Sequence, residues 1–461
     1  MKSKSRDSHS PVSPARAAAF DILLRVERES SYASELLHSA TYDRLTSLDH
    51  SLATELVMGV LRWRSVLDSQ IAGASTQPLS RLDLEVLTAL RLAVYQLGWL
   101  SRIPGRAAIN ESVELVKRAR KRSAAPFVNA VLRKLAAGIP PNHEASQRAS
   151  GASAETLAAS SAHPLWMVER WIQAYGFDSA LRICLYNQSI PVTAIRLRHP
   201  EAEDRLHAEG IELDPGVFLA SARRVLQGDI TNTPAFRADL CVIQDEASQL
   251  VAALVGRGLH VLDCCAAPGG KTAAIADHDP NSKIVAVELH PHRARLLRRL
   301  LDTRANNSER GNIGVVAADA RSLPFAVKFN RVLADVPCSG TGTLARNPEI
   351  KWRLTPEDLA DLQVRQLAIL RSATAQVAAG GRVIYSTCSL EGEENEDVVE
   401  RLLKENSSFR VIDCRAELER LQQEGELICS DPSSLTRGPY LRTLPGVHPC
   451  EGFFAAILEK T

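Results

Sequence analysis

Two cysteines in the C-terminal half of the chain lie where an apolar, strand-like stretch ends and a loop begins. Cys338 follows Asp335 in LADVPCSGTGT, and Cys388 lies in VIYSTCSLE, fifty residues later. A thiol in such a place can be a nucleophile, a metal ligand or a small core side chain. The chain contains no C-x-x-C pair, which zinc sites commonly use, so we predict no metal site and keep the other two alternatives open.

A glycine-rich turn precedes both cysteines. In VLDCCAAPGGKT (Val261 to Thr272) a strand ends, two glycines form a turn and a helix begins, so the backbone can approach a ligand closely. The phosphate-binding pattern G-x-x-x-x-G-K-[ST] fails because its first glycine would fall at Cys265, and G-x-G-x-x-G is absent. The remaining interpretation is S-adenosylmethionine (SAM), whose amino-acid end can lie over such a turn.

Acidic residues end the next two predicted strands. Glu288 lies at the end of KIVAVEL, and Asp319 closes NIGVVAAD. An acid at the first position can accept hydrogen bonds from both ribose hydroxyls, and Asp319 is placed to contact adenine. Either acid alone could cap a loop, but two in succession after a glycine-rich turn favour a ligand.

A methyl donor beside a thiol indicates a specific reaction. Carbon 5 of a pyrimidine is a poor nucleophile, but addition of a thiolate to carbon 6 makes carbon 5 enamine-like and able to take a methyl group. Lys271 and backbone N–H groups can stabilise the thiolate, and Asp335 can hold the N3 and N4 edge of cytosine. Both cysteines end parallel strands, so the residues alone do not decide which one attacks.

Two kinds of periodicity divide the chain. From Cys241 onward short apolar strands alternate with helical stretches, which predicts a doubly wound, mainly parallel α/β sheet of the Rossmann-like type. Residues 14–137 repeat apolar side chains at three- and four-residue spacing, which predicts an all-α bundle. The predicted parts are a disordered tail at 1–11, a helical domain at 12–138, a linker at 139–162, a small α+β domain at 163–240 and a catalytic domain at 241–461.

The composition is that of an ordinary globular chain. Its 461 residues are 45% hydrophobic and 24% charged, with a formal net charge of +1, so any nucleic-acid surface must come from local clusters. Nine cysteines, an odd number spread through a long chain, do not resemble a disulfide framework. The chain lacks a bilayer-spanning apolar run and a secretory signal, so we expect a cytoplasmic protein with no membrane partner.

Taken together, the motifs resemble those of the RNA cytosine-5 methyltransferases. The resemblance is carried by DCCAAPGGKT, DVPCSGTGTLARNPEIKW and YSTCSLEGEENEDVV, with VIQDEAS at 242–248 and HPCEGFFAAIL at 448–458. The N-terminal stretches SLATELVMGVLRWRSVLDSQI and FVNAVLRKL resemble a NusB-like RNA-binding domain. This combination is similar to the Sun/Fmu-type branch, which implies SAM-dependent methylation of a cytosine in 16S ribosomal RNA.

The resemblance implies a role for each matching residue. Cys388, in the T-C-S motif, is implied to be the nucleophile, and Cys338, in the P-C motif, to help release the product. Asp335 is implied to lie by the methyl donor, Glu288 to bind ribose (many relatives have Asp there), and Asp319 to lie on the adenine side. The implied cofactor turn consists of Cys265, Ala266, Ala267, Pro268, Gly269, Gly270 and Lys271.

Clusters of charge indicate where RNA can bind. VKRARKR (116–122) has five positive charges and no acid, and it is either a phosphate contact or a solvated helix end. The same two alternatives hold for the arginines at 293, 295, 298 and 299, and Trp352 either borders a base pocket or packs in a core. The acidic run 391–397 is expected to begin a helix, and we assign it no catalysis.

The resulting prediction is a SAM-dependent RNA cytosine-5 methyltransferase that acts on 16S ribosomal RNA, either naked or in a partly assembled subunit. We expect a monomer that does not act on DNA. One alternative is the same reaction on transfer RNA. Another is a non-enzymatic RNA-binding assembly factor, against which the intact Asp335, Cys338 and Cys388 argue.

Overall fold

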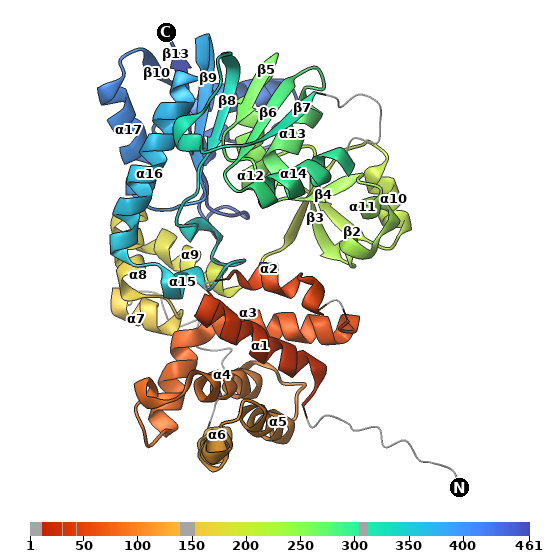
Figure 1. Ribbon diagram of the computed structural model, residues 1–461, viewed down its shortest axis with the longest axis vertical. Coiled ribbons are helices and arrows are strands. Elements are labelled where there is room, and N and C mark those ends of the chain that lie inside the picture. Colours follow the sequence, from red (N-terminus) through yellow and green to blue (C-terminus); the bar gives the residue numbers. More distant parts are fainter. Residues whose placement is uncertain (1–11, 30, 43, 139–152, 304–311) are drawn as a thin grey trace. The chain divides into compact units, whose positions relative to one another are not determined.

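A computed structural model describes the chain except for residues 1–11, 30, 43, 139–152 and 304–311 (Figure 1). The tail predicted at 1–11 and most of the linker predicted at 139–162 therefore lie outside the described residues. The described chain forms two compact units. One contains the chain up to Ile190 together with Leu344–Arg353, and the other contains Pro191–Thr343 and Leu354–Thr461.

The first unit is helical, as its apolar spacing predicts. Its helices are α1 (Pro14–Glu29), α2 (Ala33–Leu37), α3 (Ser47–Ala74), α4 (Leu84–Trp99), α5 (Gly105–Arg118), α6 (Ala125–Ala136), α7 (Ala154–Ser160), α8 (Leu165–Tyr175), α9 (Phe177–Gln188) and α15 (Ile350–Arg353). Side chains at three- and four-residue spacing, such as Leu56 and Val60 of α3 and Leu90 and Val94 of α4, meet in one apolar core. Burial of these stripes holds the bundle together.

A short segment from the C-terminal half completes this helical unit. Lys351 of α15 is 1% exposed, and its ammonium donates to the carbonyls of Arg62 (2.9 Å) and Ala162 (2.8 Å). Burial lowers the pKa of Lys351 well below its ordinary value. The indole N–H of Trp352 donates to the carbonyl of Leu61 at 2.6 Å. Trp352 thus takes the packing alternative of the two that its sequence context allows.

The elements between residues 163 and 240 divide between the two units. Helices α8 and α9 belong to the first unit, where Gln188 at the end of α9 donates to the carbonyl of Arg62 (3.2 Å). The rest of the predicted α+β domain belongs to the second unit, because Arg196 forms an ion pair with Asp277 (2.8 Å). Local periodicity identifies the elements, but long-range contacts decide which unit each element joins.

A small antiparallel sheet opens the second unit. Its strands are β1 (Thr193–Leu197), β2 (Glu212–Pro215), β3 (Ala222–Gln227) and β4 (Cys241–Ile243), in the order β2-β3-β1-β4. Helices α10 (Ala202–Ala208) and α11 (Pro234–Arg237) accompany it. Because β4 pairs with β1, this sheet extends past the boundary predicted at 240.

The main sheet of the second unit has nine strands among the described residues. They are β5 (His260–Asp263), β6 (Lys283–Glu288), β7 (Ile313–Ala317), β8 (Phe329–Asp335), β9 (Val377–Thr387), β10 (Phe409–Ile412), β11 (Thr436–Arg437), β12 (Tyr440–Arg442) and β13 (Phe454–Lys460). The order is β11-β12-β13-β9-β8-β5-β6-β7, with β10 paired to β13. The ladders from β9 to β7 are parallel, whereas β13 pairs antiparallel with β9. The five predicted strands are confirmed as a parallel group, and antiparallel strands extend it.

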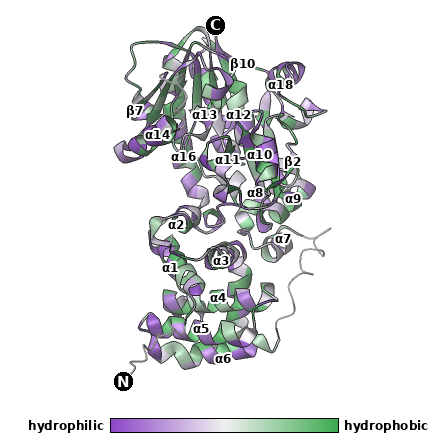
Figure 2. Ribbon diagram, turned by 90° about the vertical axis from the view of Figure 1, so that its right-hand side faces the viewer, coloured by the Kyte–Doolittle hydropathy of each residue, from purple (hydrophilic) through white to green (hydrophobic). Residues whose placement is uncertain are grey.

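Helices cover both faces of this sheet. They are α12 (Glu246–Val255), α13 (Gly270–His278), α14 (Pro291–Thr303), α16 (Pro356–Ala375), α17 (Glu396–Glu405) and α18 (Cys414–Gln423). Alternate residues of β9 point to opposite cores: Ile384 packs in the core of α12, α13 and α18, and Val383 in that of α16 and α17. This is the doubly wound arrangement that the alternating pattern predicts. The ribbon of α14 is coloured mostly as hydrophilic (Figure 2).

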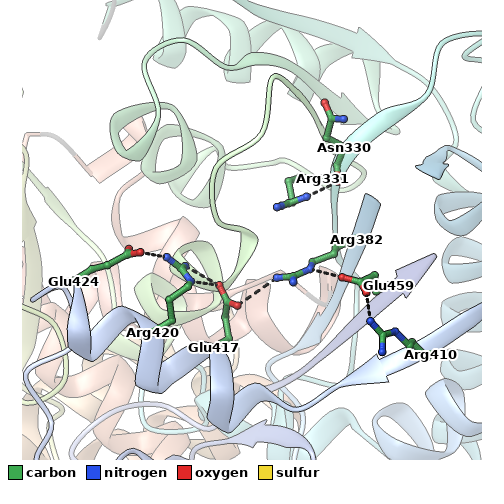
Figure 3. A network of polar contacts seen from close by, with 8 residues as sticks. All are labelled: Asn330, Arg331, Arg382, Arg410, Glu417, Arg420, Glu424 and Glu459. Carbon is green, nitrogen blue, oxygen red and sulfur yellow. Dashed lines mark hydrogen bonds and ion pairs between the residues drawn. The ribbon is translucent and has the colours of Figure 1, made fainter. Parts of the chain in front are cut away.

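An ionic network lies toward the amino ends of the central strands (Figure 3). Arg382 of β9 bridges Glu417 (3.3 Å) and Glu459 (3.1 Å) and so links α18 to β13. Arg410 and Arg420 extend the network at its two ends. Because the opposite ends of β8 and β9 lead to the two predicted thiols, this network supports the sheet away from them. Within the described residues, no helix combines the length and apolar character needed to cross a lipid bilayer.

Candidate active site

Three predicted site residues, together with Asp263, lie at the carboxyl ends of neighbouring parallel strands. Asp263 ends β5, Glu288 ends β6 and Asp335 ends β8, while Cys388 comes directly after β9. The register pairs β5 with both β6 and β8, and β8 with β9. Ligands of open α/β sheets bind at this edge, so the sheet brings together residues that are far apart in sequence.

A buried acid anchors the glycine-rich turn. Asp263 is 1% exposed, accepts a hydrogen bond from the hydroxyl of Thr272 (2.6 Å) and accepts one from the backbone N–H of Cys265 (3.3 Å). Burial raises the pKa of Asp263 to about 6, and the neighbouring charge of Asp335 adds to the rise. The sequence motifs assign this residue no role. The one local indication of a role for Asp263 is its position between the apolar strand and the adjacent residues Cys264 and Cys265.

Gly269 sets the geometry at the start of α13. Its φ is +107°, and a Cβ there would lie 2.7 Å from Cδ1 of Leu297 in α14. A side chain is therefore excluded both by conformation and by space. The first turn of α13 presents backbone N–H groups that have no acceptor within the helix. Such groups suit the carboxylate of an amino-acid ligand.

The two predicted ribose and adenine acids occupy different settings. Glu288 is 8% exposed, and its carboxylate accepts a hydrogen bond from the backbone N–H of His290 (2.9 Å). Asp319 comes after β7, the strand that pairs with β6, and forms an ion pair with the guanidinium of Arg321 at 2.6 Å. That hydrogen bond lowers the pKa of Asp319. Glu288 thus lies at the carboxyl end of β6, and Asp319 lies two residues past the carboxyl end of the adjacent strand β7.

The two thiols meet. The Sγ atoms of Cys338 and Cys388 are 3.4 Å apart, and both side chains are half-buried. The contact with Cys388, burial and the charges of Cys388 and Glu394 raise the pKa of the Cys338 thiol well above its ordinary value. Neither cysteine is fully buried, and Cys388 packs against the core that α12, α13 and α18 share.

Lys271 and Asp335 form an ion pair beside the thiols. The ammonium lies 2.8 Å from Oδ2 of Asp335, whose Oδ1 accepts a hydrogen bond from the Ser386 hydroxyl (2.7 Å). Burial alone would lower the pKa of Lys271, but Asp335 and Cys388 outweigh it and raise that pKa. The ammonium also lies 4.9 Å from the ring centre of Phe453. A cation held in this way favours a negative charge on the neighbouring sulfur.

Gly342 lets three segments meet behind the thiols. Its N–H donates to the carbonyl of Cys388 (2.9 Å), and its own carbonyl accepts from the N–H of Gly452 (2.9 Å). A Cβ at this position would lie 2.1 Å from the Gly452 carbonyl oxygen. The loop after β8, the loop after β9 and the C-terminal motif are thus tied by their backbones. The N–H of Glu451 also donates to Asp245 (3.2 Å), which joins the 242–248 motif to the same region.

The acidic run 391–397 combines two roles. Glu396 and Asp397 lie in the first turn of α17, as predicted. Glu394 instead is fully buried and accepts hydrogen bonds from the residues that follow the two cysteines. The burial of Glu394 could not be predicted, because no local pattern in the sequence separates it from its more exposed neighbour Glu393.

The basic segment at 117–122 lies at the end of α5 in the helical unit. Lys117 pairs with Glu114 (2.6 Å), and Lys121 pairs with Asp83 (3.0 Å). Arg120 and Arg122 are exposed, and neither forms an ion pair with another described residue. The exposed arginines at 293, 295, 298 and 299 lie on α14 of the other unit.

Comparisons with known proteins point to one family. A model described as 16S rRNA methyltransferase RsmB/F matches residues 255–459, and a NusB family model matches residues 13–137. The chain is 33% identical over 460 residues to a Bacillus subtilis (strain 168) protein named probable ribosomal RNA small subunit methyltransferase B, covering 96% of this chain and 98% of that protein.

Two further matches extend over the same length. The chain is 30% identical to a Vibrio cholerae serotype O1 protein named ribosomal RNA small subunit methyltransferase B, covering 96% of this chain and 97% of that one. A crystal structure described as PH0851 superposes with a TM-score of 0.77 at 23% identity, covering 97% of this chain and 98% of that one. The similarity to the PH0851 structure, at 23% identity, shows a shared fold.

Proposed function

Because the chain belongs to the family of 16S rRNA methyltransferases described as RsmB/F, with a NusB-like domain before the catalytic one, we propose that it methylates carbon 5 of a cytosine in 16S ribosomal RNA. The nucleophile is Cys388, which forms a covalent bond to carbon 6 of the base. Cys338 assists release of the methylated product.

The thiol pair beside a half-buried cation carries this proposal. The two sulfurs lie 3.4 Å apart, and Lys271 lies 2.8 Å from Asp335 at the same edge of the sheet. Formation of the bond from the Cys388 sulfur to carbon 6 moves an electron pair to carbon 5, which then accepts a methyl group. Loss of the carbon 5 proton and departure of the thiolate restore the base. In this proposal Asp335 holds the N3 and N4 edge of the cytosine.

The turn before α13 fits the methyl donor SAM, which supplies an electrophilic methyl group when bound. The N–H groups at the start of α13 would hold the carboxylate of its amino-acid end. Glu288 would accept hydrogen bonds from the ribose hydroxyls, and Asp319 would border the adenine. The cofactor turn from Cys265 to Lys271 has small side chains up to its last residue, and Gly269 keeps the backbone free of a Cβ that Leu297 would block.

RNA binding is assigned to cationic surfaces on both units. Arg120 and Arg122 offer exposed guanidinium groups at the end of α5, and the arginines of α14 offer another set. Phosphate contacts of this kind position RNA without reading its sequence. The target base must leave its stack, at a cost of a few kcal/mol, and contacts elsewhere on the RNA offset that cost.

The decisive experiment compares the wild type with Cys388→Ala and Cys338→Ala. Each protein is incubated with unmodified 16S RNA and labelled SAM, and both methyl transfer and denaturant-resistant protein–RNA adduct are measured. We expect neither product from Cys388→Ala, and accumulation of adduct with Cys338→Ala.

Two results would contradict the proposal. If the two variants exchange these behaviours, Cys338 is the nucleophile and the assigned roles are wrong. If the wild type methylates transfer RNA but leaves 16S RNA unchanged, the substrate is wrong.

A further inference from the structure

Glu394 is a buried acid in the short helical turn before α17. The side chain is fully buried, and no ion pair joins it to a lysine or arginine anywhere in the described chain. A buried carboxylate without a counter-ion is costly unless hydrogen bonds satisfy it. Its environment therefore must supply donors, and the donors come from the two thiol loops.

Four hydrogen bonds converge on this carboxylate. The backbone N–H of Ser339 and the amide of Gln366 each donate to Oε1 at 2.8 Å, and the hydroxyls of Ser339 and Ser389 donate to Oε2. Ser339 directly follows Cys338, and Ser389 directly follows Cys388. The same Gln366 amide donates to the carbonyl of Pro337 (3.1 Å). One acid thus fixes both loops at the residue next to the thiol.

The charges around the two thiols are unequal. The carboxylate of Glu394 is among the groups that raise the pKa of Cys338. Cys388 instead lies near the ammonium of Lys271. The negative charge of a Cys388 thiolate is among the causes that raise the pKa of Lys271. A negative neighbour disfavours a thiolate, whereas a positive neighbour favours it.

We propose that Glu394 is a positioning residue that assigns different roles to the two cysteines. Its carboxylate holds the loops so that the sulfurs stay 3.4 Å apart, and its charge keeps the proton on Cys338. The S–H of Cys338 then donates a hydrogen bond to the sulfur of Cys388, which is the sulfur that attacks the base. The roles of attack and release rest on the proposed function. The contacts of Glu394 and the expected difference between the two thiols can be tested without any substrate.

The test measures which thiol ionises first. The full-length protein, without RNA or SAM, is treated with iodoacetamide from pH 6 to pH 10, and alkylation of each cysteine is followed by peptide mass spectrometry. Only the thiolate reacts. In the wild type we expect Cys388 to react at least about tenfold faster than Cys338 at pH 8, which corresponds to about one pKa unit. In Glu394→Gln we expect this ratio to fall to within about threefold, because Cys338 ionises more readily.

Two control variants and one reference cysteine show whether a change in the alkylation ratio is due to the charge of Glu394. Glu396→Gln removes the same charge two residues away, where the carboxylate pairs with Arg442 (3.1 Å), and should leave the ratio unchanged. Glu394→Asp keeps the charge and should keep Cys388 ahead of Cys338. Cys429, half-buried elsewhere in the unit, reports reagent reactivity and folding in every sample.

The outcomes are separable from those of the proposed function. If Cys338 of the wild type is alkylated at lower pH than Cys388, the inference is overturned even if Glu394→Gln fails to fold. An unchanged ratio in folded Glu394→Gln overturns it as well. A wild type that shows the expected ratio but does not methylate 16S RNA overturns the proposed substrate and leaves the role of Glu394 intact.

Discussion

Replacement of Gly342 by alanine tests how closely the two thiol loops and the C-terminal motif approach each other. The new Cβ would lie 2.1 Å from the carbonyl oxygen of Gly452 and 2.8 Å from that of Cys388. Ordinary contacts begin at 3.4 Å, so the backbones must separate by about 1.3 Å. That movement exceeds what the two hydrogen bonds of Gly342, each 2.9 Å long, can absorb.

The expected magnitude follows from these contacts. Two lost hydrogen bonds destabilise the loops by about 1 kcal/mol each, and overpacking against rigid backbone adds about 1–3 kcal/mol. The total of about 3–5 kcal/mol lowers the melting temperature of the second unit. Because the carbonyl of Cys388 is one of the displaced groups, its sulfur moves as well. A displacement near 1 Å at reacting atoms slows catalysis by about 100-fold.

The assay combines single-turnover methyl transfer to 16S RNA, calorimetric binding of SAM and thermal unfolding. We expect Gly342→Ala to lose transfer rate and thermal stability while it keeps SAM affinity within about threefold, since the cofactor turn is on another loop. Gly392→Ala is the matched control, because no atom lies within 4 Å of its added Cβ. Wild-type rate and melting temperature in Gly342→Ala would refute the close approach.

Three further predictions concern the fold and its RNA surface. Burial raises the pKa of Asp263 from 3.8 to about 6, so the contribution of Asp263 to the free energy of unfolding should be largest below about pH 4 and be lost as the pH rises through 6; the difference in stability between the wild type and Asp263→Asn, measured in denaturation series across this range, should change with pH accordingly. Trp352→Phe should destabilise the helical unit by about 1 kcal/mol in urea, followed by circular dichroism, because its indole N–H loses a 2.6 Å hydrogen bond to a carbonyl of α3. Joint replacement of Arg120 and Arg122 by glutamine should weaken RNA binding and lower the salt dependence by about 1.4–1.8 in logarithmic slope, whereas Lys117→Gln, already paired within its helix, should change little.

Local patterns in the sequence predict much of this protein. The period of 3.6 identifies the helices of the first unit, and short apolar runs identify β5 to β9, because each pattern follows from which side chains can be buried together. The motifs place Asp335, Cys338 and Cys388 at strand ends, and parallel pairing gathers strand ends at one edge. The prediction that both cysteines lie at the ends of parallel strands therefore needed only the order of the elements.

Other features depend on contacts between segments that are distant in the chain. The residues next to Lys351 in the sequence do not indicate that its ammonium donates to the carbonyls of residues 62 and 162. Periodicity therefore could not show which unit this segment joins. In the sequence Glu394 cannot be distinguished from its acidic neighbours. In the structure its carboxylate accepts four hydrogen bonds from Ser339, Gln366 and Ser389. The amino-acid sequence by itself determines the elements and the chemistry at their ends. Only the tertiary structure decides which buried charges act on which thiol, because electrostatic effects depend on distance in space.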